Sequence, residues 1–292
     1  MRTEGVDVGI RFIEGTMQAD GIRRLVLRIQ EGEIHLAPSN DGAIHYAVEI
    51  EGQPELLPAW NCMIKKLEGI TIFQTPFRGE IRVLKCEVQV PPSISAIEAH
   101  STVGSIDVLN FHGDILAISE QGEITVNGAG HVEASSVDGA IAVNDCESCS
   151  LRSIEGAIIG TRIRGNAQIE TQKGMVKINR ILGNLMVATT EGSVAVSKPS
   201  GRLRLITNSG DIELEVTGTF GGGEVQTYSG DVYIQLERAS VEFRAETLSG
   251  KIDAPCPVMS AGMGPRRCAF QLGTGAKRLY VKNVLGDIEV NA

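Results

Sequence analysis

The sequence predicts an all-β fold: a single-stranded β-solenoid, similar to a β-helix, with rungs of about 18–20 residues and one short N-terminal capping helix. Between Gly165 and Gly210 a glycine recurs every nine residues. The second and fourth residues after each glycine are apolar, as in Ala167/Ile169, Val176/Ile178, Leu185/Val187, Val194/Val196, Leu203/Leu205 and Ile212/Leu214. We call each nine-residue segment that starts at one of these glycines a phrase. Because residues two apart face the same side of a strand, each phrase predicts a short strand with an inward apolar face.

Alternate phrases differ, so the true repeat is two phrases, or eighteen residues, long. Only the phrases that start at Gly165, Gly183 and Gly201 carry a threonine six residues later. A helix is excluded, because nine residues make two and a half helical turns and would scatter the apolar pairs around its circumference. Each repeat is therefore a strand, a turn, a second strand and a second turn, and stacked copies bury their apolar faces against one another.

Composition and repeat regularity predict one continuous body with three segments. The 292 residues include 34 glycines and only 4% aromatics, which suits tight turns around a narrow core. Residues 1–90 are expected to form irregular strands and a cap, residues 91–253 the regular solenoid, and residues 254–292 an irregular excursion and a final strand. A repeat array of this kind grows along one axis whatever its length.

Charge and cysteine content limit the partners and the compartment. A net charge of −9 and a pI near 5.2 disfavour nucleic acid and anionic membrane surfaces. No apolar run approaches the roughly 18 residues of a membrane span, so membrane insertion is not expected. Six cysteines are too few for a disulfide scaffold, and Glu4, Asp7 and Arg11 lie where a signal peptide needs apolar residues. We expect a cytoplasmic protein, on the condition that no leader has been removed.

The capping helix is predicted at about residues 57–68. Leu57, Trp60, Ile64 and Leu67 recur at helical spacing, and Pro58 suits a first helical turn. Gly69 follows as a helix end. A short amphipathic helix here would cover the N-terminal end of the solenoid, with Trp60 as its hydrophobic anchor.

The C-terminal region provides the candidate interaction residues. Residues 254–278 lose the strand alternation and contain Arg266 and Arg267, and long irregular insertions in a regular scaffold often carry function. The last phrase ends two residues before the terminus, and it includes Leu285, Ile288 and Val290. We expect its strand edge either to pair with another copy or to be covered by the excursion.

Several phrases resemble a known family. They are Glu87-Val88-Gln89-Val90-Pro91, Ile97-Glu98-Ala99, Thr102-Val103-Gly104-Ser105-Ile106 and the later Ser-Gly-Asp-Ile type turns such as Ser209-Gly210-Asp211-Ile212. In this order they are similar to the β-solenoid family of unknown function labelled "putative adhesin". The similarity covers most of the chain and is strongest from about residue 87 onward. The resemblance implies an all-β solenoid, and it brings no established catalytic residues to carry over to this sequence.

Cys146 and Cys149 form a lone Cys-x-x-Cys and are the only, weak, metal candidates. A structural zinc needs four ligands, so Cys256, Cys268 or a histidine such as His131 would have to complete the site. A redox dithiol usually lies at a helix start, which is not predicted here. Ordinary buried thiols are the simpler interpretation, and we predict no cofactor.

Two polar ladders are also expected. Asp114, Asp211, Asp231 and Asp287 each follow a turn glycine, but the glycine-rich pattern of calcium-binding β-rolls is not met. We therefore expect these carboxylates to accept hydrogen bonds from turn backbone. A second ladder is structural, with hydroxyls bonding along the stack or to the turn, and consists of Thr171, Thr189, Thr207, Thr227 and Thr247.

The sequence predicts a non-enzymatic interaction or assembly module that self-associates or binds a protein partner. One alternative is a surface adhesin that binds carbohydrate, although only four Tyr and one Trp are available to stack on sugars. The other is an enzyme acting on glycans, as some β-solenoids do with paired carboxylates or basic residues in a groove. No His-Asp, Ser-His or carboxylate cluster stands out from the repeat positions. The pair Arg266-Arg267 is a further candidate for binding an anionic group.

Overall fold

The computed structural model describes residues 8–76, 79–260, 264–275 and 277–292. Packing divides the chain into two compact units, Met1–Gly139 (unit 1) and Ala140–Ala292 (unit 2). This division differs from the predicted segments, which follow the regularity of the repeats rather than their packing. That the chain forms one continuous body stays a prediction.

Unit 1 consists of two rows of hydrogen-bonded strands. The first row runs β5 (Met63–Leu67), β6 (Ile70–Gln74), β2 (Arg24–Glu31), β8 (Ala96–Val103), β10 (Asp114–Gln121) and the end of β11 (Ile124–Asp138). The second runs β1 (Gly9–Gln18), β4 (Ala43–Gly52), β7 (Ile81–Val90), β3 (Glu33–Pro38), β9 (Ile106–Leu109) and the beginning of β11. Pairing is parallel within the repeats and antiparallel in β5–β6, β1–β4 and β4–β7.

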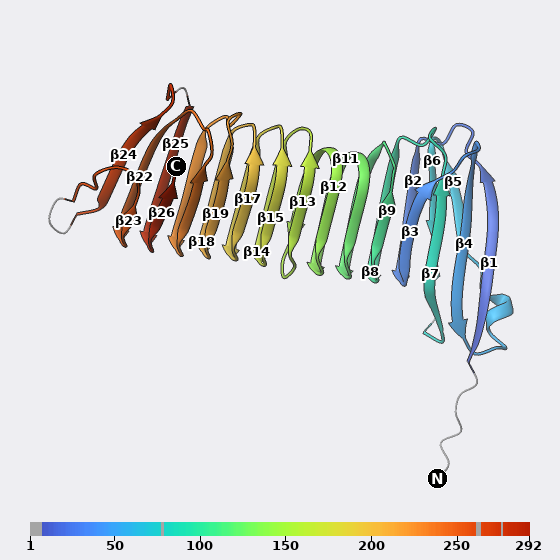
Figure 1. Ribbon diagram of the computed structural model, residues 1–292. Helices are drawn as coiled ribbons and strands as arrows, with labels where there is room; N and C mark the ends of the chain where they lie inside the picture. Colours follow the sequence, from blue (N-terminus) through green and yellow to red (C-terminus); the bar gives the residue numbers. More distant parts are fainter. Residues whose placement is uncertain (1–7, 77–78, 261–263, 276) are drawn as a thin grey trace, which may run out of the picture. The chain divides into compact units, whose positions relative to one another are not determined.

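Unit 2 repeats the same two-row plan (Figure 1). One row begins in β12 (Ile141–Ser153) and continues through β13 (Ile158–Ile163), β15 (Val176–Ile181), β17 (Val194–Pro199), β19 (Ile212–Val216), β21 (Val232–Leu236), β26 (Ile288–Asn291) and β23 (Ile252–Asp253). The other begins at the end of β12 and continues through β14 (Ala167–Lys173), β16 (Leu185–Glu191), β18 (Leu203–Ser209), β20 (Gly223–Ser229), β25 (Lys277–Leu285), β22 (Val241–Ser249) and β24 (Arg266–Leu272).

The strand register confirms the predicted solenoid-like repeat. Leu185 pairs with Leu203 eighteen residues later, and Leu205 pairs with Val225 twenty residues later. Inward positions are buried and stack apolar residue on apolar residue, which gives each unit its core. The all-β class is confirmed.

Glycines at the corners let successive rungs approach closely. Gly174, Gly192 and Gly210 occupy equivalent corners, and a Cβ at Gly192 would overlap the carbonyl of Gly174. Gly210 also has a φ of +139°, which side-chain-bearing residues rarely adopt. The nine-residue glycine spacing therefore reflects backbone stacking at the corners.

The predicted capping helix is wrong. The segment contains a single 3₁₀ turn at Leu57–Ala59, after which Trp60 is extended and Met63–Leu67 pairs with β6 as a hairpin. Gly69, with a φ of +72°, belongs to the two-residue hairpin turn rather than to a helix end. So short a helix is marginal without tertiary packing, whereas the hairpin satisfies the backbone of both strands. In the described part of the chain, no helix has the length and hydrophobicity to cross a membrane.

The last strands do not lie at the end of their rows. β25 lies between β20 and β22, and β26 lies between β21 and β23. The C-terminal rung, made of β25 and β26, is therefore inserted between two rungs that precede it in the sequence. Ile288 and Val290 are consequently buried, while Leu285 is 43% exposed. The excursion supplies β24, which pairs antiparallel with the outer side of β22. The expectation that the excursion covers an edge fits this arrangement, and the exposed final edge does not occur.

Candidate functional site

The edge of β1 presents unpaired backbone groups in unit 1. Among the described residues, β1 pairs only with β4. The N–H of Ala19 donates to the carbonyl of Gly42 at 3.2 Å, continuing a register that pairs Gln18 with Ala43. Hydrogen-bonded and non-hydrogen-bonded pairs alternate in an antiparallel ladder, so odd-numbered residues of β1 bond to β4. The N–H and C=O groups of its even-numbered residues, from Ile10 to Gln18, therefore point away from β4.

The same stretch carries exposed apolar side chains. Val8, Ile10 and Phe12 alternate along the outward face and are all exposed, Phe12 by 65%. We call these three residues the β1 stripe. The charge of Arg11 does not shield this apolar stripe, because its Nη1 donates to the backbone carbonyls of Leu57 and Trp60.

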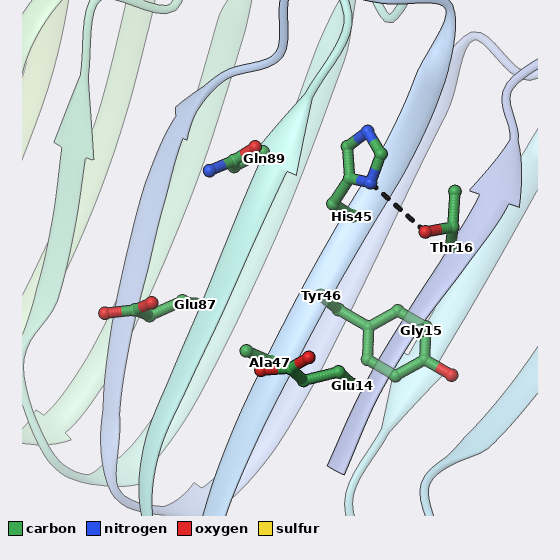
Figure 2. A pocket seen from close by; sticks show the side chains of 8 residues that line it. All are labelled: Glu14, Gly15, Thr16, His45, Tyr46, Ala47, Glu87 and Gln89. Atoms are coloured by element: carbon green, nitrogen blue, oxygen red, sulfur yellow. Dashed lines mark hydrogen bonds between the residues drawn. The ribbon is translucent and has the colours of Figure 1, made fainter. Parts of the chain in front are cut away.

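A hollow of about 390 Å³ lies farther along this face (Figure 2). Ala47 of β4 is small and lies between Glu14 of β1 and Glu87 of β7, which are its cross-strand neighbours. Tyr46 turns its ring beside Gly15, where a Cβ would overlap it, and packs on Phe73 at a centroid distance of 5.0 Å. The hollow is thus an outward depression formed by a small side chain in a row of larger ones.

A hydrogen-bonded chain of three side chains borders this hollow. The carboxylate of Asp41 lies 2.9 and 3.0 Å from Nε2 of His45, whose Nδ1 lies 3.1 Å from the Thr16 hydroxyl (Figure 2 shows the second contact). Hydrogen bonds from Ser39 and His45 lower the pKa of Asp41 to about 2. The sequence alone did not reveal this set of three side chains, because only the β1–β4 pairing brings Thr16 to His45.

The order carboxylate, imidazole, hydroxyl also occurs in hydrolases. Here Asp41 additionally accepts from the backbone N–H of Ala43 at 3.0 Å and binds the Ser39 hydroxyl at 2.7 Å, so it organises the turn into β4. The three hydrogen-bonded side chains are open to solvent, whereas catalytic oxyanion stabilisation depends on a water-excluded site. Its geometry supports a turn-fixing role.

Comparison with known proteins places the fold. Residues 85–291 match the family model described as Toastrack DUF4097. The chain belongs to the Toastrack family. This confirms the resemblance seen in the repeats, and the Toastrack region begins inside β7, so β1 and β4 precede it. No curated protein matches the chain.

Solved structures similar to this Toastrack chain share little sequence with it. One, titled "putative adhesin" and from Bacteroides fragilis, is 10% identical with a TM-score of 0.42, and the match covers 96% of this chain and 97% of that one. Another, titled "Putative lipid binding protein" and from Parabacteroides distasonis, is 12% identical with a TM-score of 0.30, covering 96% and 97%. Neither likeness bears on function.

Cys146 and Cys149 lie together in β12 of the Toastrack region, and both are buried. A hydrogen bond between the two thiols, together with burial, raises the pKa of Cys149. Cys256 and Cys268 form a separate neighbouring pair at β24, seven strands away, or roughly 34 Å at about 4.8 Å per strand. Within the described ranges no three His, Cys, Asp or Glu side chains gather as a metal site.

The aspartates of the Toastrack turns bind backbone, as predicted. Oδ1 of Asp211 accepts the N–H of Asp231, and Oδ1 of Asp231 accepts the N–H of Asp287, both at 2.8 Å. Asp287 accepts the N–H of Lys251 at 2.7 Å, and Asp114 accepts that of His131 at 3.3 Å. Each carboxylate thus accepts a hydrogen bond from the next rung. The bonds run from Asp231 to Asp287 and from Asp287 to Lys251, because the C-terminal rung lies between the other two.

The buried threonine ladder is present, with part of its predicted bonding. Thr171 donates to the carbonyl of Lys173 and Thr247 to that of Gly286, both at 3.1 Å. Thr207 reaches the carbonyl of Gly192 at 3.5 Å. Asn283 takes the threonine position in β25 and donates to the carbonyl of Gly230 at 2.8 Å. These side chains satisfy corner carbonyls inside the stack, which is a structural role.

Arg266 and Arg267 lie at the start of β24, opposite Thr247 and Glu246 of β22. Both arginines are exposed, and Nε of Arg267 binds the Glu246 carboxylate at 3.2 Å. Arg267 also lines a second hollow, over β22 and β24. The structure therefore separates the predicted interaction residues: Arg267 borders a hollow, whereas Ile288 and Val290 belong to the core.

Proposed function

We propose that this chain is a non-enzymatic interaction module that assembles by pairing the free edge of β1 with β1 of a second copy. The observation that supports this most strongly is that two features that favour strand pairing occur at the same two residues. Ile10 and Phe12 combine unpaired backbone groups directed to the edge with exposed apolar side chains. An edge of this kind is a template for pairing with another strand.

Two other row ends, β5 and β24, are protected against such pairing. β5 ends the first row of unit 1 and carries Lys65 and Lys66, and charged side chains discourage strand addition. β24 ends a row of unit 2, and the backbone of Met259 bridges its outer side at Arg267 with hydrogen bonds of 2.8 and 2.9 Å. Among the residues that the structure describes, none gives β1 equivalent protection along the stripe, since the guanidinium of Arg11 is held by backbone carbonyls.

The stripe complements itself in one register. In an antiparallel two-fold pair, Ile10 faces Ile10 of the second copy, and Val8 faces Phe12. Even-numbered residues then face each other, so their free N–H and C=O groups bond across the new edge. A register in which Ile10 faces Phe12 would place Arg11 opposite Arg11, and like charges directly opposite destabilise a pair. A register in which Phe12 faces Phe12 would place the apolar Ile10 opposite the charged Glu14.

Sedimentation velocity across protein concentrations tests the assembly. A contact of one short strand on each side falls below the size of a typical stable interface, so we expect a weak dimer that dissociates on dilution from about 1 mM. Phe12→Glu should leave a folded monomer. Leu182→Glu is the matched control, because Leu182 is 62% exposed and lies outside β1, and it should not change the mass. A wild-type monomer throughout, or equal effects of both substitutions, would refute the proposal.

Oxidative cross-linking tests the register. Opposed residues of a hydrogen-bonded pair lie about 5.5 Å apart at Cα, within reach of a disulfide. Ile10→Cys should therefore form a cross-linked dimer, and Phe12→Cys, which faces Val8, should not. The unsubstituted protein controls for its own six cysteines. Cross-linking through Phe12→Cys alone would reject this register while leaving the assembly itself to the sedimentation result.

A further inference from the structure

A second hollow, of about 540 Å³, lies on the outward face of β25, β22 and β24 in unit 2 (Figure 1 shows the three strands). Strand register sets Tyr280, Arg244 and Ala269 side by side across the three strands. Ala269 is the small side chain in this row. The adjoining row contains Glu246 and Arg267, and the backbone bridge at Met259 closes the far side.

The surroundings of the hollow are positive, in a chain whose net charge is −9. Glu242 binds Arg244 at 2.7 Å and Arg278 at 3.1 Å. Glu246 binds Arg267 at 3.2 Å and Lys282 at 3.9 Å. These four cations share two carboxylates, a sum of +2 (4 − 2) over the six residues. Arg244 and Arg267 line the hollow, and Arg278 and Lys282 lie beyond its lining.

These ion pairs leave guanidinium donors for a ligand. Arg244 uses Nε and one terminal nitrogen on a single oxygen of Glu242, and Arg267 uses Nε on Glu246. A guanidinium has five N–H donors, so both arginines retain donors in a geometry that fits a carboxylate. The paired glutamates hold the arginines in position and reduce the ordering that binding requires.

Apolar surface lies beside these charges. Tyr280 is half-buried, Met259 is exposed, and Phe270 packs on Phe243 at a centroid distance of 4.9 Å beneath the rim. Gln271 and Glu242 add side-chain acceptors at the other rim. A ligand that suits this lining carries a carboxylate, several hydroxyls and an apolar ring face.

We propose that this hollow binds an acidic saccharide of the uronic-acid class. The sugar carboxylate binds the free donors of Arg244 and Arg267, its hydroxyls bind Glu242 and Gln271, and its ring face lies on Tyr280 beside Ala269. The site is on different strands from the β1 stripe, so it stands or falls independently of the proposed assembly.

Isothermal titration calorimetry with tri-galacturonate tests the site, with maltotriose and inorganic phosphate as comparison probes. Tri-galacturonate should bind, and added salt should weaken it because the contact is charged. Arg244→Gln should weaken binding by about tenfold or more, since it removes a charge-assisted hydrogen bond. Ala269→Leu fills the hollow without changing charge and should weaken binding similarly.

Arg204→Gln is the matched control, because Arg204 is an exposed arginine on β18 that pairs with Glu224 at 3.7 Å, outside the hollow. It should leave the affinity unchanged. No binding of tri-galacturonate at about 10 mM would overturn the proposal, as would maltotriose or phosphate binding equally well. Binding that neither Arg244→Gln nor Ala269→Leu reduces would place the sugar elsewhere and also overturn it.

Discussion

Leu279→Ala should strongly destabilise unit 2, because the structure places its strand inside a row rather than at the end. Leu279 is fully buried and pairs with Gly223 on one side and Phe243 on the other. The substitution removes three carbon atoms, or about 2.4 kcal/mol at about 0.8 kcal/mol per buried methylene. Gly223 has no side chain to fill the space, so a cavity term raises the expected loss to about 3–4 kcal/mol.

Urea unfolding followed by circular dichroism measures this loss, with Leu285→Ala as the control. Leu285 lies on the same strand but is 43% exposed, so the same chemical change there should cost less than about 1 kcal/mol. Amide hydrogen exchange gives an independent readout, because amides of an interior β25 exchange slowly. If Leu279→Ala costs no more than Leu285→Ala, or β25 amides exchange freely, the inserted rung is wrong.

Three further predictions follow from single sites. The lowered pKa of Asp41, about 2, means that its ionised form stabilises the native state above roughly pH 4, and that this contribution is lost as the pH falls to 2; Asp41→Asn should flatten acid unfolding in that window. Gly210→Ala should lower the thermal midpoint by several degrees through steric overlap at the corner, whereas Gly42→Ala, with open space around it, should not. Asp231→Ala should destabilise by about 1 kcal/mol in urea and Asp231→Asn by much less, because the amide keeps the acceptor for the next rung.

The repeats made most of the fold predictable, because local pattern and neighbour contact coincide in a stack. A residue such as Val187 follows a glycine at fixed spacing, so its inward direction and its pairing with Leu205 both follow from the eighteen-residue period. The aspartate ladder was predictable for the same reason. A turn carboxylate one rung away from an equivalent N–H meets that donor whatever the rest of the fold does.

The stacking order of the last rungs was not predictable from this pattern. The period assigns Val232 and Ile252 to successive rungs, yet Ile288 pairs with both and lies between them. Neighbouring rungs have the same apolar pattern, so any of them satisfies the core of another. The order depends on where the chain rejoins the stack after residues 254–278, a stretch whose sequence carries no periodic signal.

The capping helix predicted from the helical spacing at residues 57–67 was wrong for a related reason. Apolar residues at positions 57, 60, 64 and 67 fit a helix, but the pairing of Ile64 with Phe73 gives the same residues a hairpin partner. A long-range ladder then outweighs a weak local preference. The candidate sites have the same origin, since Thr16 reaches His45, and Arg267 reaches Glu246, only through antiparallel pairs.

Antiparallel strands connect the two proposals. Within the parallel repeats, strands such as β16 have a neighbour on both sides and equivalent residues stack, so the outward face repeats one pattern and offers little that is distinctive. An antiparallel strand such as β1 or β24 ends that repetition and sets unlike residues side by side. A small residue then falls among larger ones, as Ala47 and Ala269 do, and hollows form beside them. Binding sites in this chain are therefore expected where antiparallel strands join the repeats, and the regular rungs between them are expected to tolerate outward substitutions without loss of binding.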